Sequence, residues 1–409
     1  MYKSSYNLVK ELFESDITRF HNVLFEISDN RIFHKLSFLE SSIVTSNYFE
    51  FISKKQKNAI INKIYSLKFP KNISYQENFS CIYGNCSLLC GTYLLFGENF
   101  IEIPAVKTIF HSLLLGINRY HFSIFEKKEN KTVSVSDYDL LFGITSFFNL
   151  YLELFSKTIF RDNFLEKKLI EILDYYLTFE FNEFKYLKIS NKHEMNGIYL
   201  GCAHGLFGIY SVLKKYLAIT NQINTHSLII KNINNIELFL QKNSLSTYRY
   251  IYPSILASNL IDKNDFFFKK NLSWCHGLAG YLDLLVDSSE KKWSIYYGRK
   301  NEIIKEARKF ISEAIIENPI TSSATFCHGL TGLIYACYKT KDVQFSDTID
   351  SLLIKLHSLK QNDDIVFYDH SVNEYASKYD IISGSIGTWL TLSSLYYNKP
   401  FNGDFIFGK

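Results

Sequence analysis

The chain has 409 residues, of which 47% are hydrophobic and 16% aromatic, so it can bury a substantial core. Its 5 prolines, and the lack of any tract rich in proline, glycine and serine, favour one domain over residues 1–409. The net charge of +4 is small for this length, and no basic cluster with interleaved aromatic residues occurs, which argues against nucleic-acid binding.

No segment for export or membrane insertion is predicted. Residues 1–6 lack the apolar core of a signal peptide, and no stretch of about 18 uninterrupted apolar residues occurs, so we expect a cytoplasmic protein. The 7 cysteines are an odd set without the spacing of small secreted proteins, and a disulfide framework is therefore not expected. Five of them are expected to be buried thiols, namely Cys81, Cys86, Cys90, Cys202 and Cys337.

Glycine-led apolar segments recur along the chain at a period of roughly 50 to 70 residues, the length of a helical hairpin with its connections. The first glycines of these segments are Gly84, Gly143, Gly205, Gly277, Gly329 and Gly384. The register is G-x-x-G, except that Ser87 and Ser146 replace the second glycine in the first two copies.

Two kinds of helix are predicted to alternate along the chain. The segments that follow the glycines, such as 206–213 and 330–336, are apolar on nearly every side and are predicted to be buried inner helices. The segments between them carry one apolar stripe and one charged face, which predicts outer helices. Three of these amphipathic segments lie at 165–176, 301–318 and 349–356.

This alternation predicts an all-α fold, and specifically a closed α/α toroid rather than an open solenoid. Neither end carries a polar capping repeat, which favours closure. The glycine turns would then all face one end of the ring. The long interval between Gly205 and Gly277 is interpreted either as a small extension at 244–271 or as a connection without a role, and residues 248–253 within it resemble a short strand.

Three of the glycine-led turns place a histidine directly before the glycine, and two of these add a cysteine before the histidine. The histidines are His204, His276 and His328, and the cysteines are Cys275 and Cys327. Cysteine and histidine are preferred zinc ligands, and residues at one phase of a repeat can come together in space. The functional site is therefore predicted at these turns.

The segments G-x-A-H-G-x-x-G, W-C-x-G and C-H-G, in this order and spacing, resemble those of the lanthionine synthetase C-like family. Tyr138 and Asp139 before Gly143 are similar to the family's Y-D-x-x-x-G segment. The resemblance covers almost the whole chain, including the glycine repeat. It implies an α/α toroid with one central zinc ion, held at the positions of Cys275 and of the Cys327-His328 pair.

The resemblance also implies the activity of a free-standing class I lanthipeptide (lantibiotic) cyclase. Such an enzyme adds a substrate cysteine thiol to dehydroalanine or dehydrobutyrine in a ribosomal precursor peptide, made of a leader and a core, and so closes a (methyl)lanthionine thioether ring. No dehydratase domain precedes the repeat, so a separate dehydratase is an expected partner, together with an ABC transporter of the same pathway. Through these partners we expect the cytoplasmic enzyme to reach the membrane surface.

The residue types suit this chemistry. Three protein ligands leave the fourth tetrahedral position of zinc open for a peptide thiol, which zinc makes available as thiolate at neutral pH. Addition leaves an enolate that needs a proton. We predict that His204, the one in-register histidine without an adjacent cysteine, delivers it, and that Asp139 orients the imidazole, as its family position also implies.

Two positions depart from the family pattern. His276 stands where the family commonly has tyrosine, and it offers either a second acid or a fourth zinc ligand. Because a fourth protein ligand would close the position that the thiol needs, we predict that His276 lies near the zinc without binding it. Asn271 stands in place of the family's arginine, which removes a cation that could support the enolate. Lys269 and Lys270 are the nearby cations that could substitute, but their register differs, so the sequence does not settle what replaces the arginine.

Two other interpretations stay open. In one, Cys275, His276, Cys327 and His328 form a closed structural zinc site in a scaffold that binds a peptide or glutathione without chemistry. In the other, the ring resembles the β-subunits of prenyltransferases, which also activate a peptide thiol on zinc. Those rings use a carboxylate ligand, and no aspartate occupies the matching phase of this repeat.

Overall fold

The structure is a computed structural model, and the description below concerns the residues that it places. These are residues 7–12, 38–48, 53–55, 58–59, 79–82, 84–126, 135–155, 162–180, 183–184, 187, 189–190, 196–220, 223–257, 271–316, 319–361, 364–365, 368–369, 374–375 and 380–408. The chain divides into two compact units. Unit 1 comprises Met1–Glu40, Leu240–Ser254 and Asn264–Phe401, and unit 2 comprises Ser41–Phe239, Ile255–Lys263 and Asn402–Lys409.

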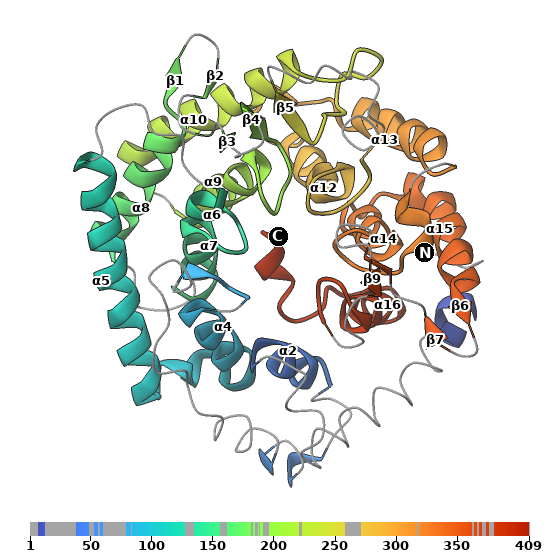
Figure 1. The fold of residues 1–409 in the computed structure, drawn as a ribbon, viewed down its shortest axis with the longest axis horizontal. Coiled ribbons are helices and arrows are strands. Elements are labelled where there is room, and N and C mark those ends of the chain that lie inside the picture. The colour runs from blue at the N-terminus through green and yellow to red at the C-terminus, as the bar shows by residue number, and fades with distance from the viewer. Residues whose placement is uncertain are drawn as a thin grey trace. The chain divides into compact units, whose positions relative to one another are not determined.

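Unit 2 consists mainly of two rows of helices (Figure 1). The first row follows the first three glycines of the repeat and contains α4 (Asn85–Phe96), α7 (Ile144–Phe155) and α9 (Leu206–Ile219). The second row contains α5 (Pro104–Glu126), α8 (Asn163–Tyr176) and α10 (Ile223–Lys242). Helix α7 packs between α4 and α9, while α5 packs against both α4 and α8. The predicted buried and amphipathic helices are thus confirmed in this unit.

Shorter elements complete unit 2. They are α6 (Val135–Tyr138), the 3-10 helices η2 (Gly97–Glu102) and η5 (Asp404–Phe407), and most of α2 (Phe38–Tyr48). A hairpin pairs β1 (Phe179–Glu180) with β2 (Glu183–Phe184). An antiparallel three-stranded sheet has the order β3 (Ile189–Ser190), β4 (Asn196–Tyr199) and β5 (Ile255–Ala257). Gly197 of β4 lies opposite Ala257 of β5.

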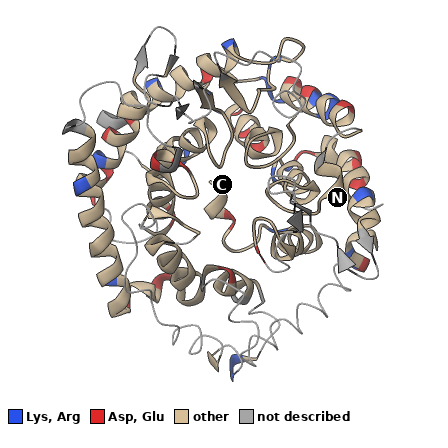
Figure 2. Ribbon diagram, viewed as in Figure 1, with Lys and Arg blue, Asp and Glu red and all other residues tan. Residues whose placement is uncertain are grey.

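Unit 1 repeats the arrangement with the last three glycines. Its first row contains α12 (Leu278–Ser288), α14 (Leu330–Lys339) and α16 (Ser385–Tyr397), and α14 packs between the other two. Helices α13 (Lys300–Ala314) and α15 (Ser346–Ser358) cover one side of this row. Figure 2 shows charged residues of both signs along α13, whereas α16 carries none. The remaining elements are η3 (Pro319–Ser322), η4 (Val343–Phe345), β6 (Lys360–Gln361), β7 (Asp364–Ile365), β8 (Tyr368–Asp369) and β9 (Glu374–Tyr375).

Backbone hydrogen bonds join the glycine turns of each unit. In unit 2 the amide of Leu140 donates to the carbonyl of Ala203 at 3.0 Å. In unit 1 the amide of Trp274 donates to the carbonyl of Cys327, and the amide of Cys327 donates to Ile382, both at 2.9 Å. Because these bonds hold consecutive turns at backbone distance, residues one repeat apart in the sequence become neighbours within each unit.

The second glycine of the register explains how neighbouring repeats approach so closely. A Cβ atom at Gly332 would overlap the carbonyl oxygen of Phe326 and would lie 3.1 Å from the Cβ of Trp274 in the preceding turn. Only glycine allows this approach without displacing backbone.

One local prediction was wrong. Residues 248–253 do not form a strand; the strand nearest to them is β5, which starts at Ile255. The amides of Arg249 and Tyr250 both donate at 2.9 Å to the carboxylate of Glu306 on α13, so side-chain acceptors satisfy them. Residues 258–270 of the predicted extension lie outside the described residues.

The expected buried thiols are confirmed, since Cys81, Cys86, Cys90, Cys202 and Cys337 are all buried and none of them belongs to a disulfide. In the part of the chain that the structure describes, no single helix is long and apolar enough to cross a membrane. One bent pair, Asn85–Glu102 with Pro104–Ile124, meets the length and composition required, with an angle of 95° between its halves.

Candidate functional site

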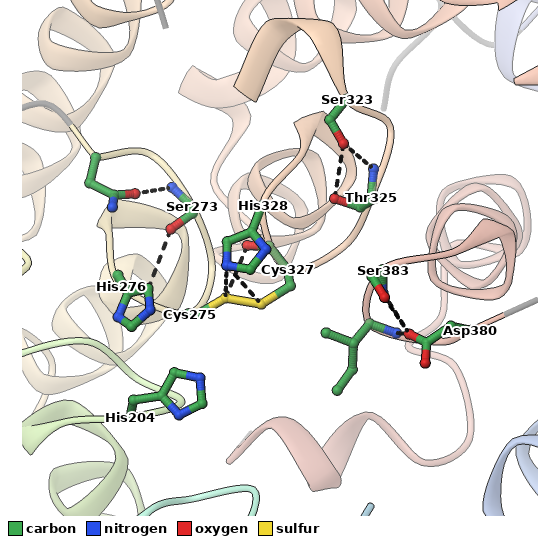
Figure 3. Close-up of a disulfide and its surroundings, with 12 residues drawn as sticks. His204, Ser273, Cys275, His276, Ser323, Thr325, Cys327, His328, Asp380 and Ser383 are labelled. Atoms are coloured by element: carbon green, nitrogen blue, oxygen red, sulfur yellow. Dashed lines mark hydrogen bonds between the residues drawn. A yellow bond between two sulfur atoms is a disulfide. The ribbon is translucent and has the colours of Figure 1, made fainter. Parts of the chain in front are cut away.

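The two Cys-His turns of unit 1 converge on one point (Figure 3). The sulfur atoms of Cys275 and Cys327 and a ring nitrogen of His328 all lie within 4.8 Å of one another. The Nε2 atom of His328 lies 3.2 Å from the sulfur of Cys275 and 3.7 Å from that of Cys327. Both cysteines are buried, while the imidazole is partly exposed.

Local packing holds this group in place. The indole ring of the fully buried Trp274 packs against the ring of Phe326, with centroids 5.7 Å apart, so the residues preceding the two cysteines form a shared apolar base. The amide of Gly277 donates to the carbonyl of Ser273 at 3.0 Å and closes the first turn. The Cα atoms of Cys275 and Cys327 are therefore only 5.6 Å apart.

The two sulfurs are joined as a disulfide in the structure, whereas the sequence predicts that both bind a metal ion. A disulfide and a pair of cysteine ligands on one metal ion require the same backbone geometry, in which the two cysteine side chains point toward each other at close range. Zinc binding requires the two sulfurs in the reduced, thiolate state. With His328 they then form a donor set of two sulfurs and one imidazole nitrogen, which fits zinc.

His276 lies beside this group but is not one of its members. Its ring is roughly parallel to that of His328, at an angle of 24° and with centroids 6.4 Å apart. Its backbone amide donates to the hydroxyl of Ser273 at 3.4 Å, which belongs to the same turn (Figure 3).

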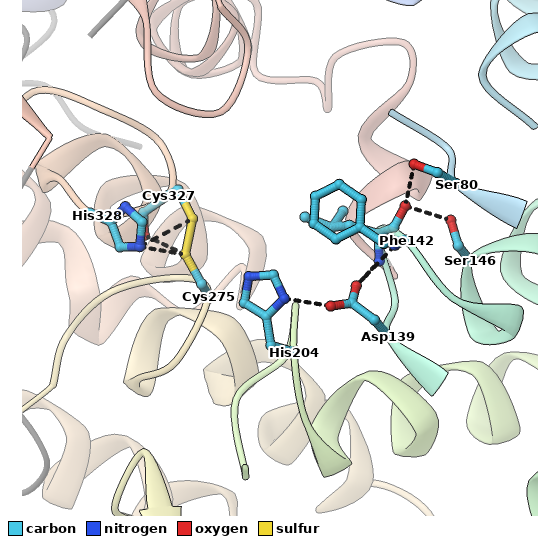
Figure 4. Close-up of polar contacts among 9 residues, drawn as sticks. Ser80, Asp139, Phe142, Ser146, His204, Cys275, Cys327 and His328 are labelled. Carbon is cyan, nitrogen blue, oxygen red and sulfur yellow. Dashed lines mark hydrogen bonds and ion pairs between the residues drawn. A yellow bond between two sulfur atoms is a disulfide. The ribbon is translucent and has the colours of Figure 1, made fainter. Parts of the chain in front are cut away.

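In unit 2, Asp139 and His204 form a direct pair (Figure 4). The Oδ2 atom of Asp139 lies 2.5 Å from Nδ1 of His204. The other oxygen, Oδ1, accepts hydrogen bonds from the amides of Leu141 at 2.6 Å and Phe142 at 3.0 Å. The carboxylate is 1% exposed, so its orientation is set by these partners rather than by solvent.

The ring of Phe142 adds a second constraint on the imidazole. It stacks on His204 with an interplanar angle of 8° and centroids 6.0 Å apart. Because Asp139 engages Nδ1, the Nε2 atom is the ring nitrogen through which His204 can exchange a proton with a substrate. Phe142 was not among the residues predicted from the sequence, and its place between Asp139 and Gly143 is the signal that could have identified it.

The pKa of His204 is raised above its ordinary value of 6.5 by two effects that outweigh a third. Burial by itself would lower the pKa, because it disfavours the imidazolium. The negative charge of Asp139 and its hydrogen bond to the ring favour the imidazolium and prevail. The pair therefore retains a proton at higher pH than a free histidine would.

The predicted site residues thus form two groups, each with its own local geometry. Cys275, Cys327 and His328 meet in unit 1 with His276 beside them, and Asp139 pairs with His204 in unit 2.

Comparison with known proteins gives three similarities. A family model described as "Lanthionine synthetase C-like protein" matches residues 110–407. The nisin biosynthesis protein NisC of Lactococcus lactis subsp. lactis is 25% identical over 371 residues, which cover 84% of this chain and 82% of the relative. A solved structure of nisin cyclase matches with a TM-score of 0.68 at 17% identity, covering 96% of this chain and 97% of that one. The structural match and the predominance of helices bear out the predicted fold class, an all-α α/α toroid.

Proposed function

Because the chain belongs to the lanthionine synthetase C-like family, we propose that it is a zinc-dependent lanthipeptide cyclase. It would add cysteine thiols of a precursor peptide to dehydroalanine or dehydrobutyrine residues of the same peptide and so form (methyl)lanthionine rings. The observation that carries this proposal is the convergence of Cys275, Cys327 and His328 within 4.8 Å on two adjacent turns. The likeness to the nisin biosynthesis protein NisC supports the same activity.

Cys275, Cys327 and His328 would hold the metal through two sulfurs and one nitrogen. Zinc bound there would supply a Lewis acid that lowers the pKa of a substrate thiol and so makes it nucleophilic at neutral pH. Among the residues that the structure describes, the protein would present these three ligands and no fourth. The grouping of three donor atoms, with His276 beside them, supports an open position over the closed site of a binding scaffold.

His204 would act as the general acid. Because its pKa is raised, a larger share of the ring is protonated at a given pH than in a free histidine, and its Nε2 would deliver the proton to the Cα atom of the enolate after the carbon–sulfur bond has formed. Asp139 would hold the ring and stabilise its positive charge, and the stacked Phe142 would limit its rotation. His276 would assist beside the metal as a second acid.

The expected partners follow from this chemistry. The substrate would be a dehydrated precursor peptide that contains a leader and a core. A dehydratase must first remove water from serine or threonine to make the electrophile, and an ABC transporter would export the product of such a lantibiotic pathway.

The test is to replace either cysteine and to measure metal and cyclisation together. We expect protein purified under reducing conditions to contain one zinc per chain, and Cys275→Ala or Cys327→Ala to lose both zinc and ring formation. Cys337→Ala, which alters another buried cysteine of unit 1, should retain both. Metal analysis and thiol alkylation of a dehydrated precursor, read by mass spectrometry, give the two results. Wild-type protein without zinc at neutral pH would contradict the proposal.

A further inference from the structure

Asn271 lies at the start of the turn that leads through Cys275 into α12. Its backbone carbonyl accepts a hydrogen bond from the amide of Leu278 at 3.0 Å, and its Oδ1 accepts one from the amide of Ser273 at 2.8 Å. The side chain also covers Gly277, where a Cβ atom would lie 2.6 Å from Oδ1. Asn271 is therefore held at both its backbone and its side chain, in the same turn as a metal-binding cysteine.

The orientation of this amide follows from its partner. A backbone N–H can only donate, so the atom that faces Ser273 must be oxygen and the other must be nitrogen. Asn271 is only 8% exposed, and in the described part of the chain its Nδ2 is buried without a hydrogen-bond partner. A buried donor without an acceptor is unfavourable, so an oxygen atom brought by a ligand would stabilise this arrangement.

The reaction creates such an oxygen. When the thiolate sulfur forms its bond to the Cβ atom of the dehydro residue, the electron pair of the C=C bond moves toward the adjacent carbonyl group. Negative charge collects on the carbonyl oxygen until Cα takes a proton from the imidazolium, after which the C=O bond is restored. A neutral hydrogen-bond donor that faces this oxygen would stabilise it more strongly in the transition state than in the substrate.

We propose that Nδ2 of Asn271 donates a hydrogen bond to the carbonyl oxygen of the dehydro residue under attack, which makes Asn271 a catalytic residue of the addition step. This inference rests on the proposed cyclase function. The substrate group recognised is the amide carbonyl of dehydroalanine or dehydrobutyrine, and no additional cation is needed to stabilise the enolate.

The sharpest test is Asn271→Asp. Aspartate has the same shape and retains the oxygen that accepts from Ser273, but its second oxygen is a donor only when protonated. With a synthetic peptide that carries one dehydroalanine and one cysteine, we expect kcat to fall by roughly 10²-fold at neutral pH with little change in KM. The ratio of variant to wild-type kcat should rise as the pH is lowered from 8 to about 5, because the new carboxyl group becomes a donor.

Two further variants separate this role from a structural one. Asn271→Ala lacks both the donor and the acceptor, so its kcat should be low at every pH and its ratio to wild type should stay constant. Asn398→Asp, at the exposed C-cap of α16, adds the same charge elsewhere and should cyclise like wild type. Zinc content and melting temperature are measured for each protein, so that losses of metal or of fold are recognised.

The outcomes are distinct. Three results for Asn271→Asp would overturn the inference and leave the cyclase function intact. The first is a kcat equal to that of the wild type, and the second is a fall in kcat that occurs only together with lost zinc or a lowered melting temperature. The third is a ratio of variant to wild-type kcat that does not change with pH. A wild-type protein that does not accelerate ring closure over buffer would overturn both.

Discussion

At the scale of single residues, the Asp139–His204 pair determines how the protein should respond to pH. The folded-state pKa of His204 is raised above 6.5, so the pair contributes stability that is fully present below pH 6.5 and is lost as the pH rises through the raised pKa. The same proton is the one that the proposed mechanism consumes. Activity and this part of the stability should therefore decline over the same pH range.

We predict that kcat/KM for cyclisation falls as the pH rises through the raised pKa of His204. In Asp139→Asn the carboxylate that raises the pKa is gone, so the fall should move to lower pH and the rate at neutral pH should drop by roughly 10²–10⁴. Rate–pH profiles of both proteins check this. Glu171→Gln, which alters the part-buried pair of His121 and Glu171, is the control and should leave the profile unchanged.

His204→Ala should show a loss in the same range with zinc still bound. The double variant of Asp139 and His204 should be little slower than the slower single variant, because residues that act as one unit are strongly non-additive. If Asp139→Asn and His204→Ala both cyclise at the wild-type rate, the proton comes from elsewhere.

His276 gives a separate prediction. Because its ring lies beside His328 rather than within the group of ligand atoms, His276→Ala should bind zinc as tightly as wild type but cyclise more slowly. Competition with a chelator measures the affinity, and the peptide assay measures the rate. His357→Ala on α15 is the matched control. A large loss of zinc affinity in His276→Ala would instead support a closed structural site.

At the scale of elements, the turns before the inner helices are the parts of the fold that make the site. Within each unit, backbone hydrogen bonds join consecutive turns, as when the amide of Trp274 donates to the carbonyl of Cys327. The helix that follows begins at the residue after the glycine, as α12 and α14 do. The ligand geometry therefore depends on how tightly adjacent repeats pack. Glycine at the second register position is what permits that packing.

Gly332→Ala should test this dependence. The added methyl group would overlap the carbonyl oxygen of Phe326, one residue before the ligand Cys327, and would press on Trp274. We expect a loss of about 1–3 kcal/mol in the free energy of unfolding and weaker zinc binding. Denaturant unfolding and metal titration measure the two effects. Ser312→Ala on the exposed face of α13 should change neither, and an unaltered zinc affinity in Gly332→Ala would show that the turn tolerates the shift.

At the scale of the whole molecule, the fold should not depend on the metal. Both units bury extensive apolar surface between their helix rows, with residues such as Phe148, Ile172, Leu285 and Leu353 fully or almost fully buried. Small metal-dependent domains lack such a core and unfold without their ion. In a chain of 409 residues the contribution of three ligands is minor by comparison.

Removal of zinc by a chelator under reducing conditions should therefore abolish cyclisation while far-ultraviolet circular dichroism retains the helical signal. Added zinc should restore activity without refolding. A cooperative loss of helix on chelation would show that the metal has a structural role, as in the scaffold interpretation.

The amino-acid sequence by itself determined the helix pattern and the residues that bear chemistry. The glycine period located the start of the six described helices that follow these glycines, and apolar stripes located outer helices such as α13, because periodicity is a local property of the chain. The phase of the repeat singled out the turns that carry His204, Cys275 with His276, and Cys327 with His328 for the same reason, and the family resemblance implied that Cys275, Cys327 and His328 are the ligands. The strand at 248–253 was misplaced because the acceptor for its amides, Glu306, lies on a helix more than 50 residues away.

Only the tertiary structure decided which atoms meet. In the folded chain, one oxygen of Asp139 accepts from the turn amides and the other contacts His204. The ring of Phe142 stacks on the imidazole of His204, and Nδ2 of Asn271 is a buried donor. These features depend on hydrogen bonds and ring contacts between turns, some of which join residues 65 positions apart, as Asp139 and His204 are. A polar group has many possible partners in an unfolded chain, and the packing of neighbouring repeats selects one of them.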